Sequence, residues 1–221
     1  MTHTVHPYAH RLGTLRDWRS RWFVTDKARY REYLKADTVI REYLEKRLRG
    51  MYVSDIEIER NQKFLRVIIK TSRPGMIIGR SGEGATKLKS DITKITKKLK
   101  LAENPELKID IEEIRSPESN AAIVGQMVAE ALEKRMPFRR ILKQTIEKVM
   151  ANRDVKGVRI GMSGRLGGAE MSRSEELKRG RIPLQTIRAD IDFARIAAKL
   201  PYGVIGIKVW IYRGDIFEKD R

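Results

Sequence analysis

Gly79-Arg80-Ser81-Gly82 has the residue types and the spacing of a loop that binds a nucleic-acid backbone. Glycines let phosphate groups come close to the main chain, and a helix that follows offers its positive N-terminal end to them. Arg80 adds a cation that can face a phosphate, and Ile77 and Ile78 are expected to form an apolar surface beneath bases. These residues predict a loop that holds phosphates.

The elements around the loop make this interpretation more specific than the tetrapeptide itself, because the same glycine spacing recurs at 161–164, 164–167 and 203–206. Only 79–82 lies between a short apolar helix and a basic amphipathic helix, after two alternating strands and before a third. This order, α-β-β-α-α-β, favours a KH domain, whose G-x-x-G loop clamps about four single-stranded nucleotides. A nucleotide-hydrolase phosphate loop fits less well, because Ala85 stands where that motif requires Lys.

Three cations, Arg139, Arg140 and Lys143, share one side of the helix expected over 138–150. At about 100° per residue they occupy an arc beside the apolar stripe of that helix. Three cations on one rigid helix can follow successive phosphates, although a solvated helix face explains the bare pattern more simply. The apolar stripe consists of Phe138, Ile141, Leu142, Thr145, Ile146 and Val149.

The segment 163–183 mixes glycine and arginine and is expected to form a loop between two strands. Guanidinium groups in such a loop can stack on bases and fork onto phosphates of an irregular RNA surface. A flexible hairpin loop explains the composition equally well. The candidate RNA-binding side chains of this segment are Arg165, Arg173, Lys178, Arg179 and Arg181.

Residues that could support catalysis or hold a metal form no convincing group. The three histidines, His3, His6 and His10, lie beside Pro7, which disrupts a regular turn, and no further ligand is obvious. Asp190 and Asp192 alternate on a strand with an arginine and read as a structural ion pair. The chain has no cysteine, which excludes disulfides and thiolate metal sites. We expect no enzyme activity, no cofactor and no metal.

The charge distribution points to nucleic acid as the partner. The 221 residues carry a net charge of +18, with +13 in residues 1–100, −1 in 101–150 and +6 in 151–221. Positive ends around a neutral middle suit an extended polyanion. No apolar run approaches the roughly 18 residues of a membrane helix, and the start lacks a secretory apolar core. We therefore expect a cytoplasmic protein without a membrane partner.

The pattern of elements predicts an α+β protein with a short arm and two domains. Residues 1–24 read as an N-terminal arm, 25–115 as the KH domain, and 116–221 as two helices followed by an antiparallel sheet. Asp37 is expected to cap a second helix within 26–49. Ser116-Pro117 is expected to begin the first helix of the C-terminal domain, with Ser as N-cap.

Several motifs resemble small-subunit ribosomal protein three, the KH-domain family of the small-subunit head, in its bacterial form. The resemblance covers nearly the whole chain in order. It rests on Val5-His6-Pro7, Arg11-Leu12-Gly13, Arg73-Pro74-Gly75, Ile78 to Glu83, Phe138-Arg139-Arg140, Ser163 to Glu170, Arg188 to Asp192 and Tyr202 to Ile211.

The resemblance implies a structural RNA-binding protein that binds rRNA in the head and lines the mRNA entrance. In the family, basic residues of the entrance helix contact mRNA and help to unwind it, and these fall on Arg139, Arg140 and Lys143. The resemblance also implies that the N-terminal domain is a type-two KH domain and that the C-terminal α+β domain docks on rRNA, which the Gly/Arg segment would contact. Implied neighbours are head proteins ten and fourteen and entrance proteins four and five, with no small-molecule substrate.

Two other classes of function stay open on the sequence alone. A free-standing KH-domain regulator would bind RNA sequence-selectively as an isolated protein, whereas a ribosomal component would cosediment with small subunits. A nucleic-acid lyase would need an activated Lys amine, and no residue stands out for that role.

Overall fold

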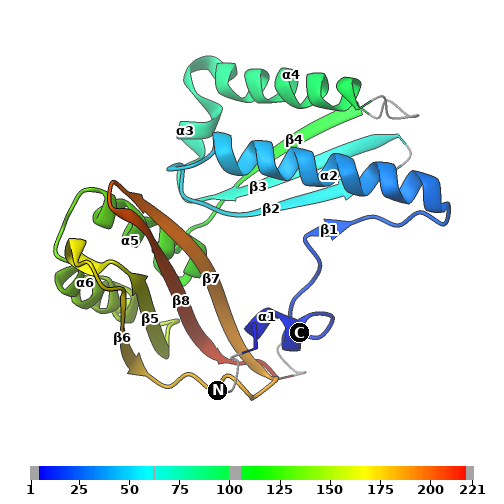
Figure 1. Ribbon diagram of the computed structural model, residues 1–221. Helices are drawn as coiled ribbons and strands as arrows, with labels where there is room; N and C mark the ends of the chain where they lie inside the picture. The colour runs from blue at the N-terminus through cyan, green and yellow to red at the C-terminus, as the bar shows by residue number, and fades with distance from the viewer. Residues whose placement is uncertain (1–4, 62, 100–105, 218–221) are drawn as a thin grey trace. The chain divides into compact units, whose positions relative to one another are not determined.

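The computed structural model describes residues 5–61, 63–99 and 106–217 (Figure 1). The chain forms two compact units. The N-terminal unit contains Trp18–Arg115, and the C-terminal unit contains Ser116 onward together with the residues up to Asp17. Every helix in the described ranges is too short or too polar to cross a bilayer.

The N-terminal unit is a four-stranded sheet with helices on one face. Its sheet order is β1-β2-β3-β4, with β2 and β3 antiparallel and with β1 and β4 each parallel to its neighbour. The expected order α-β-β-α-α-β is confirmed, and the two-residue β1 adds a short edge. The elements are β1 Ser20–Arg21, α2 Lys27–Arg47, β2 Val53–Arg60, β3 Phe64–Thr71, α3 Pro74–Ile78, α4 Glu83–Lys98 and β4 Glu106–Glu113.

Helices α2 and α4 lie against this sheet (Figure 1), and apolar residues at helical spacing hold them there. Ile40 and Leu44 of α2 and Ile92 of α4 are completely buried. They pack in one cluster with alternate residues of β2 and β3, such as Ile58 and Val67. The side chains of alternate strand residues point to the same face, so this cluster covers one side of the sheet.

Asp37 does not cap a helix, contrary to the expectation from the sequence. A single helix, α2, begins after Asp26, whose carboxylate accepts the Ala28 N–H, and continues to Arg47. Asp37 lies in its middle, 3% exposed, and accepts hydrogen bonds from Trp22 Nε1 at 2.7 Å and Arg60 Nη2 at 3.2 Å. A buried carboxylate needs such partners, so Asp37 ties residues before α2 to the end of β2.

The C-terminal unit confirms the expected arrangement of two helices and an antiparallel sheet. Helices α5 and α6 pack on one face of a sheet with the order β6-β5-β8-β7. All three strand pairs are antiparallel. The elements are α1 Pro7–Arg11, η2 Pro117–Ser119, α5 Ala121–Glu133, α6 Phe138–Ala151, β5 Gly157–Gly164, η3 Leu166–Gly168, β6 Arg173–Gly180, β7 Ala189–Leu200 and β8 Gly203–Asp215.

The first long helix of this unit begins later than the sequence suggested. Ser116-Pro117 leads only into the short turn η2, and α5 starts at Ala121 with Asn120 as its cap. The Asn120 side chain accepts the N–H groups of Ala122 and Ile123, while Asp192 Oδ2 accepts that of Ala121 at 2.8 Å. A tertiary contact from β7 therefore fixes this helix start, and local spacing could not reveal it.

The Gly/Arg segment contains a strand that the sequence pattern did not indicate. Residues 173–180 form β6 at the edge of the sheet, paired with β5 along its whole length. Its side chains are mostly exposed on both faces, so the segment lacks the apolar alternation by which strands are recognised. Pairing with β5 makes it a strand in spite of its polar composition.

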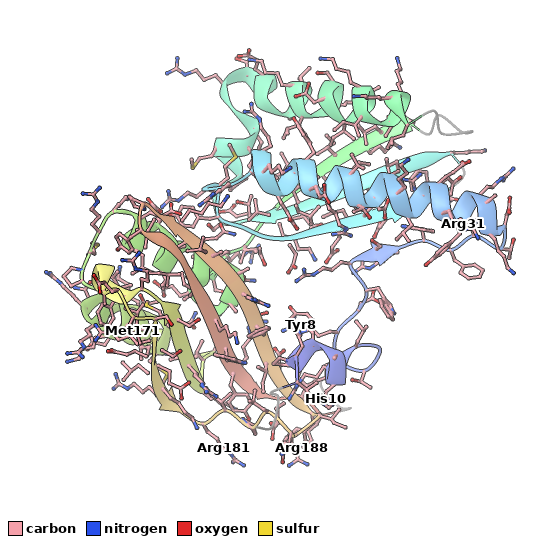
Figure 2. All side chains as sticks on the ribbon, viewed as in Figure 1. Tyr8, His10, Arg31, Met171, Arg181 and Arg188 are labelled. Atoms are coloured by element: carbon pink, nitrogen blue, oxygen red, sulfur yellow. The ribbon has the colours of Figure 1, made fainter. Side chains whose placement is uncertain are left out.

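Residues 5–17 pack on the C-terminal unit, whereas 18–24 belong to the N-terminal unit, so the expected arm is divided. Arg11 is completely buried and donates to the carbonyl oxygens of five residues, Pro7, Pro183, Leu184, Thr186 and Ala189. Burial lowers the pKa of Arg11, partly offset by nearby Asp190. Tyr8, labelled in Figure 2, donates from its hydroxyl to Asp192 at 3.1 Å.

Candidate nucleic-acid interface

The loop Gly79–Gly82 forms a single tight turn between α3 and α4. Gly79, Ser81 and Gly82 all have positive φ, at +71°, +52° and +78°. Gly82 is the N-cap of α4 and provides no side-chain hydrogen bond, and the Glu83 N–H donates to the Arg80 carbonyl oxygen within the loop. Arg80 is exposed and makes no ion pair with any described residue. The loop therefore presents one exposed cation at the start of a helix.

The apolar residues beside the loop differ from those expected. Ile77 is 2% exposed and belongs to the core, so it cannot lie beneath bases. Ile78 is 39% exposed and Met76 is 52% exposed, so these two side chains form the accessible apolar surface. In a single helical turn the neighbours of a buried residue point outward, and the sequence alone did not say which of the three was buried.

Gly84 fixes the close approach of α3 and α4, because no side chain fits there. A Cβ atom at this position would lie 2.3 Å from the Ile77 carbonyl oxygen and 2.9 Å from that of Ile78. We expect Gly84→Ala to lower the free energy of unfolding of the N-terminal unit by about 1–3 kcal/mol, as overpacking does. Urea unfolding followed by circular dichroism measures this change.

Gly75→Ala is the matched control, since a Cβ at Gly75 meets nothing within 4 Å and its φ is not positive. The control should unfold close to wild type. Equal stability of the two variants would contradict the tight packing inferred at Gly84.

The three cations of α6 lie on its exposed side, as the helical spacing predicts. Arg139, Arg140 and Lys143 are all exposed, and Arg140 and Lys143 form no ion pair with any described residue. The opposite side of the helix is buried and consists of Ile141, Leu142, Ile146 and Val149.

The structure brings Arg139 of α6 and Arg173 of β6 together. Arg139 is held by Glu175 of β6, with Nη2 and Nε at 3.3 and 3.4 Å from its carboxylate oxygens. The guanidinium of Arg173 lies over the Phe138 ring at 5.2 Å, and that of Arg139 at 5.7 Å. The start of β6 and the start of α6 thus form one basic surface.

Arg165 has a local structural role. Its Nε donates to Ala169 O at 2.9 Å and its Nη1 to Tyr202 O at 3.1 Å. These bonds join the turn η3 to the hairpin between β7 and β8. Part of the guanidinium is therefore engaged within the protein.

The remaining basic residues of the segment do not share one surface. Arg179 pairs with buried Val158 and Lys178 with Arg159 of β5, so Arg179 and Lys178 lie on opposite faces of the sheet. Figure 2 shows Met171 near the start of β6 and Arg181 at its far end. The sequence treated these cations as one set, but the pleat and length of β6 separate them.

The residues set aside as catalytic candidates have structural partners. Arg213 lies 3.6 Å from Asp190 and 3.1 Å from Asp192, and Arg16 lies 2.7 Å from Asp190. These ion pairs join residue Arg16 of the N-terminal segment, strand β7 and strand β8. His6 stacks edge-on against Phe193, and His3 lies outside the described residues. In the described residues, no group of three metal-ligating side chains is present.

Sequence reasoning missed three cations on the strands: Arg159 on β5, Arg195 on β7 and Lys208 on β8. Each stands between residues of the core shared with α5 and α6, so it projects from the other face of the sheet. The alternation of apolar and polar residues along each strand already indicated the face from which each cation projects. A single charge within an apolar run is a weaker signal for a binding site than a basic cluster.

Two family profiles match the chain, one in each unit. The profile described as "KH domain" matches residues 39–119, and "Ribosomal protein S3, C-terminal domain" matches residues 128–211. The first covers the exposed glycine loop and the second covers α6 and most of the C-terminal sheet.

Relatives resemble the chain over nearly its full length. "Small ribosomal subunit protein uS3" of Caldicellulosiruptor saccharolyticus is 44% identical over 98% of this chain and 94% of its own length. Its namesake of Acidobacterium capsulatum is 43% identical over 100% of this chain and 95% of its own length. That of Clostridioides difficile is 43% identical over 98% of this chain and 77% of its own length.

The fold and its basic surfaces define a two-unit RNA-binding protein with an N-terminal KH domain. Sequence identity above 40% over at least 98% of the chain is sufficient to assign the family. The chain belongs to the small ribosomal subunit protein uS3 family. Proteins of this family are non-enzymatic, RNA-binding proteins of the small ribosomal subunit.

Proposed function

We propose that this chain lines the mRNA entrance of the small subunit and helps to open mRNA duplexes through Arg139, Arg140 and Lys143. The observation that carries the proposal is the placement of three exposed cations within five residues of one rigid helix. A helix packed by four buried side chains keeps these charges at fixed separations. Fixed cations can bind each strand of an opening duplex through its phosphates.

The test is the unwinding of a structured mRNA by ribosomes that carry Arg139, Arg140 and Lys143 all changed to Ala. We expect unwinding to slow severalfold. We also expect the log–log salt dependence of single-stranded mRNA binding to fall by about 2, since three lost phosphate contacts contribute about 0.7 each. Filter binding and single-ribosome unwinding assays measure the two effects.

The control is a variant with Lys134, Lys148 and Arg153 changed to Ala, which removes the same charge from the same unit outside the arc. If both variants unwound mRNA at the wild-type rate, the proposed role of α6 would be wrong.

The other basic residues support a role in anchoring the chain to rRNA of the head. In this proposal the exposed loop Gly79–Gly82 holds single-stranded RNA, and Arg173, Lys178, Arg179 and Arg181, with the accessible part of Arg165, contact rRNA. The family resemblance adds proteins ten and fourteen of the head, and proteins four and five of the entrance, as neighbours in cytoplasmic ribosomes.

A further inference from the structure

A hollow of about 470 Å³ lies on the face of the C-terminal sheet that α5 and α6 do not cover. Residues 5–7 form one wall, and side chains from all four strands form the floor. Arg159, Arg195 and Lys208 line it together with Phe193 and Trp210. None of the residues proposed to contact mRNA lines this hollow.

Two of these cations lie side by side without a counter-charge. Arg195 of β7 and Lys208 of β8 are directly opposite one another in the ladder, and both are exposed. Like charges in this position repel one another. Neither forms a hydrogen bond or an ion pair with any residue that the structure describes. An anion bound between them would relieve the repulsion.

The acidic residues around the hollow are already engaged. Glu176 binds Arg159 through Nε at 3.1 Å and again through Nη2 at 2.5 Å. Glu175 binds Arg139 on the helix side. Neither carboxylate pairs with Arg195 or Lys208, so these two cations face the hollow without a partner among the described residues.

Trp210 places an aromatic ring beside the cations of the hollow. The residue is 6% exposed, and its Nε1 is a buried donor without a hydrogen-bond partner. The Arg159 guanidinium lies over its ring at 4.8 Å, and the Phe193 ring lies 5.2 Å away. Buried donors without partners are uncommon in folded proteins. Because the indole nitrogen is itself inaccessible, the acceptors of a ligand would face the ammonium and guanidinium groups of Lys208 and Arg195.

The balance of donors and acceptors favours RNA over a peptide. A peptide segment brings an N–H donor with nearly every carbonyl acceptor, and the sheet uses its own backbone groups in the strand ladders. A phosphodiester brings two charged acceptor oxygens and no donor. Since the free groups of the hollow are donors, the RNA backbone matches them and a peptide does not.

We propose that this hollow is a binding site for an RNA phosphodiester, held between Arg195 and Lys208. The site extends beyond the proposed mRNA contact of α6, because it lies on the opposite face of the sheet from that helix and uses other residues. Lys178, a candidate from the sequence, lies on the same face of the sheet at its edge strand but does not line the hollow.

The test uses the full-length protein and a fluorescein-labelled 20-nucleotide oligouridylate. We expect Arg195→Gln with Lys208→Gln to weaken binding severalfold and to lower the log–log salt slope by up to about 1.4, for two lost phosphate contacts. The matched control is Lys148→Gln with Arg153→Gln, which removes the same charge outside the hollow. Equal slopes and equal affinities for the two double variants would overturn the proposal.

Trp210 supplies a direct readout of occupancy. The chain has three tryptophans, so indole N–H NMR spectra contain three side-chain signals, and Trp210→Phe identifies the relevant one. We expect oligouridylate to shift the Trp210 signal in the wild type and in the control, but not in the Arg195/Lys208 variant. An unchanged Trp210 signal in RNA-saturated wild type would overturn the proposal.

A polyglutamate peptide of 20 residues tests the rival occupant. If it shifted the Trp210 signal as strongly as oligouridylate, and if the shift required Arg195 and Lys208, the site would be one for acidic peptides instead. The Ala variant of Arg139, Arg140 and Lys143 should keep the Trp210 shift. Failure at the hollow and failure at the entrance helix are therefore distinguishable.

Discussion

Replacement of Arg11 by Ala is expected to lower the free energy of unfolding of the C-terminal unit by about 3–5 kcal/mol, as the loss of a buried charged network does. The side chain is completely buried, and its three nitrogens donate to five carbonyl oxygens. Four of these carbonyls lie between residues 183 and 189. The truncation leaves several of them buried without a donor.

Unfolding in guanidinium chloride, monitored by circular dichroism, measures the effect. Where the two units unfold at different denaturant concentrations, each transition is analysed separately. Arg188→Ala is the control, because its ion pair with Asp215 is 62% exposed on the arginine side and is worth at most about 1 kcal/mol. Arg11→Lys should fall between them, since an ammonium cannot reach carbonyls in the same fork. If the Arg11→Ala variant were as stable as the control, the buried hydrogen bonds of Arg11 would contribute little to stability.

Asp37→Ala is the corresponding prediction for the N-terminal unit, with an expected loss of about 3–5 kcal/mol. The side chains of Asp37 and Arg60 are only 4% and 2% exposed, so the substitution leaves an uncompensated charge in the core. The Arg60 guanidinium lies 4.2 Å from the centre of the Tyr33 ring, and this contact cannot replace a carboxylate. Trp22 Nε1 loses its acceptor at the same time.

A second substitution separates this charge effect from a loss of packing. Asp37→Ala combined with Arg60→Met should recover part of the stability, because the buried charge is then absent as well. Asp110→Ala serves as the control, since the side chains of Arg66 and Asp110 are 41% and 42% exposed and a solvent-accessible ion pair contributes at most about 1 kcal/mol. A double variant less stable than Asp37→Ala alone would show that the unpaired arginine is not the cause.

The sequence predicted those features that depend on local periodicity. The apolar stripe of α6 left Arg139, Arg140 and Lys143 exposed because 3.6 residues per turn decides which side is buried. The order of strands and helices around Gly79–Gly82 followed in the same way. For each single helix or strand, the information lies within the few turns or residues of that element.

Features that depend on distant partners were beyond reach. Asp37 resembled a helix cap because nothing nearby shows that Arg60 and Trp22 surround it. The strand β6 resembled a loop because its pairing with β5 replaces the apolar pattern. The placement of Arg195 opposite Lys208 requires the register of β7 and β8, which no single segment contains.

The divided C-terminal unit has a consequence for the order of events during synthesis. Arg11 and its acceptor Ala189 are 178 positions apart in the chain. At a synthesis rate of about 5–20 residues per second, Ala189 is added roughly 9–36 s after Arg11. Residues 18–115 are complete well before then and can fold first. Arg11 therefore lacks most of its acceptors while the N-terminal unit is being synthesised. Its buried hydrogen bonds can form only near the end of translation.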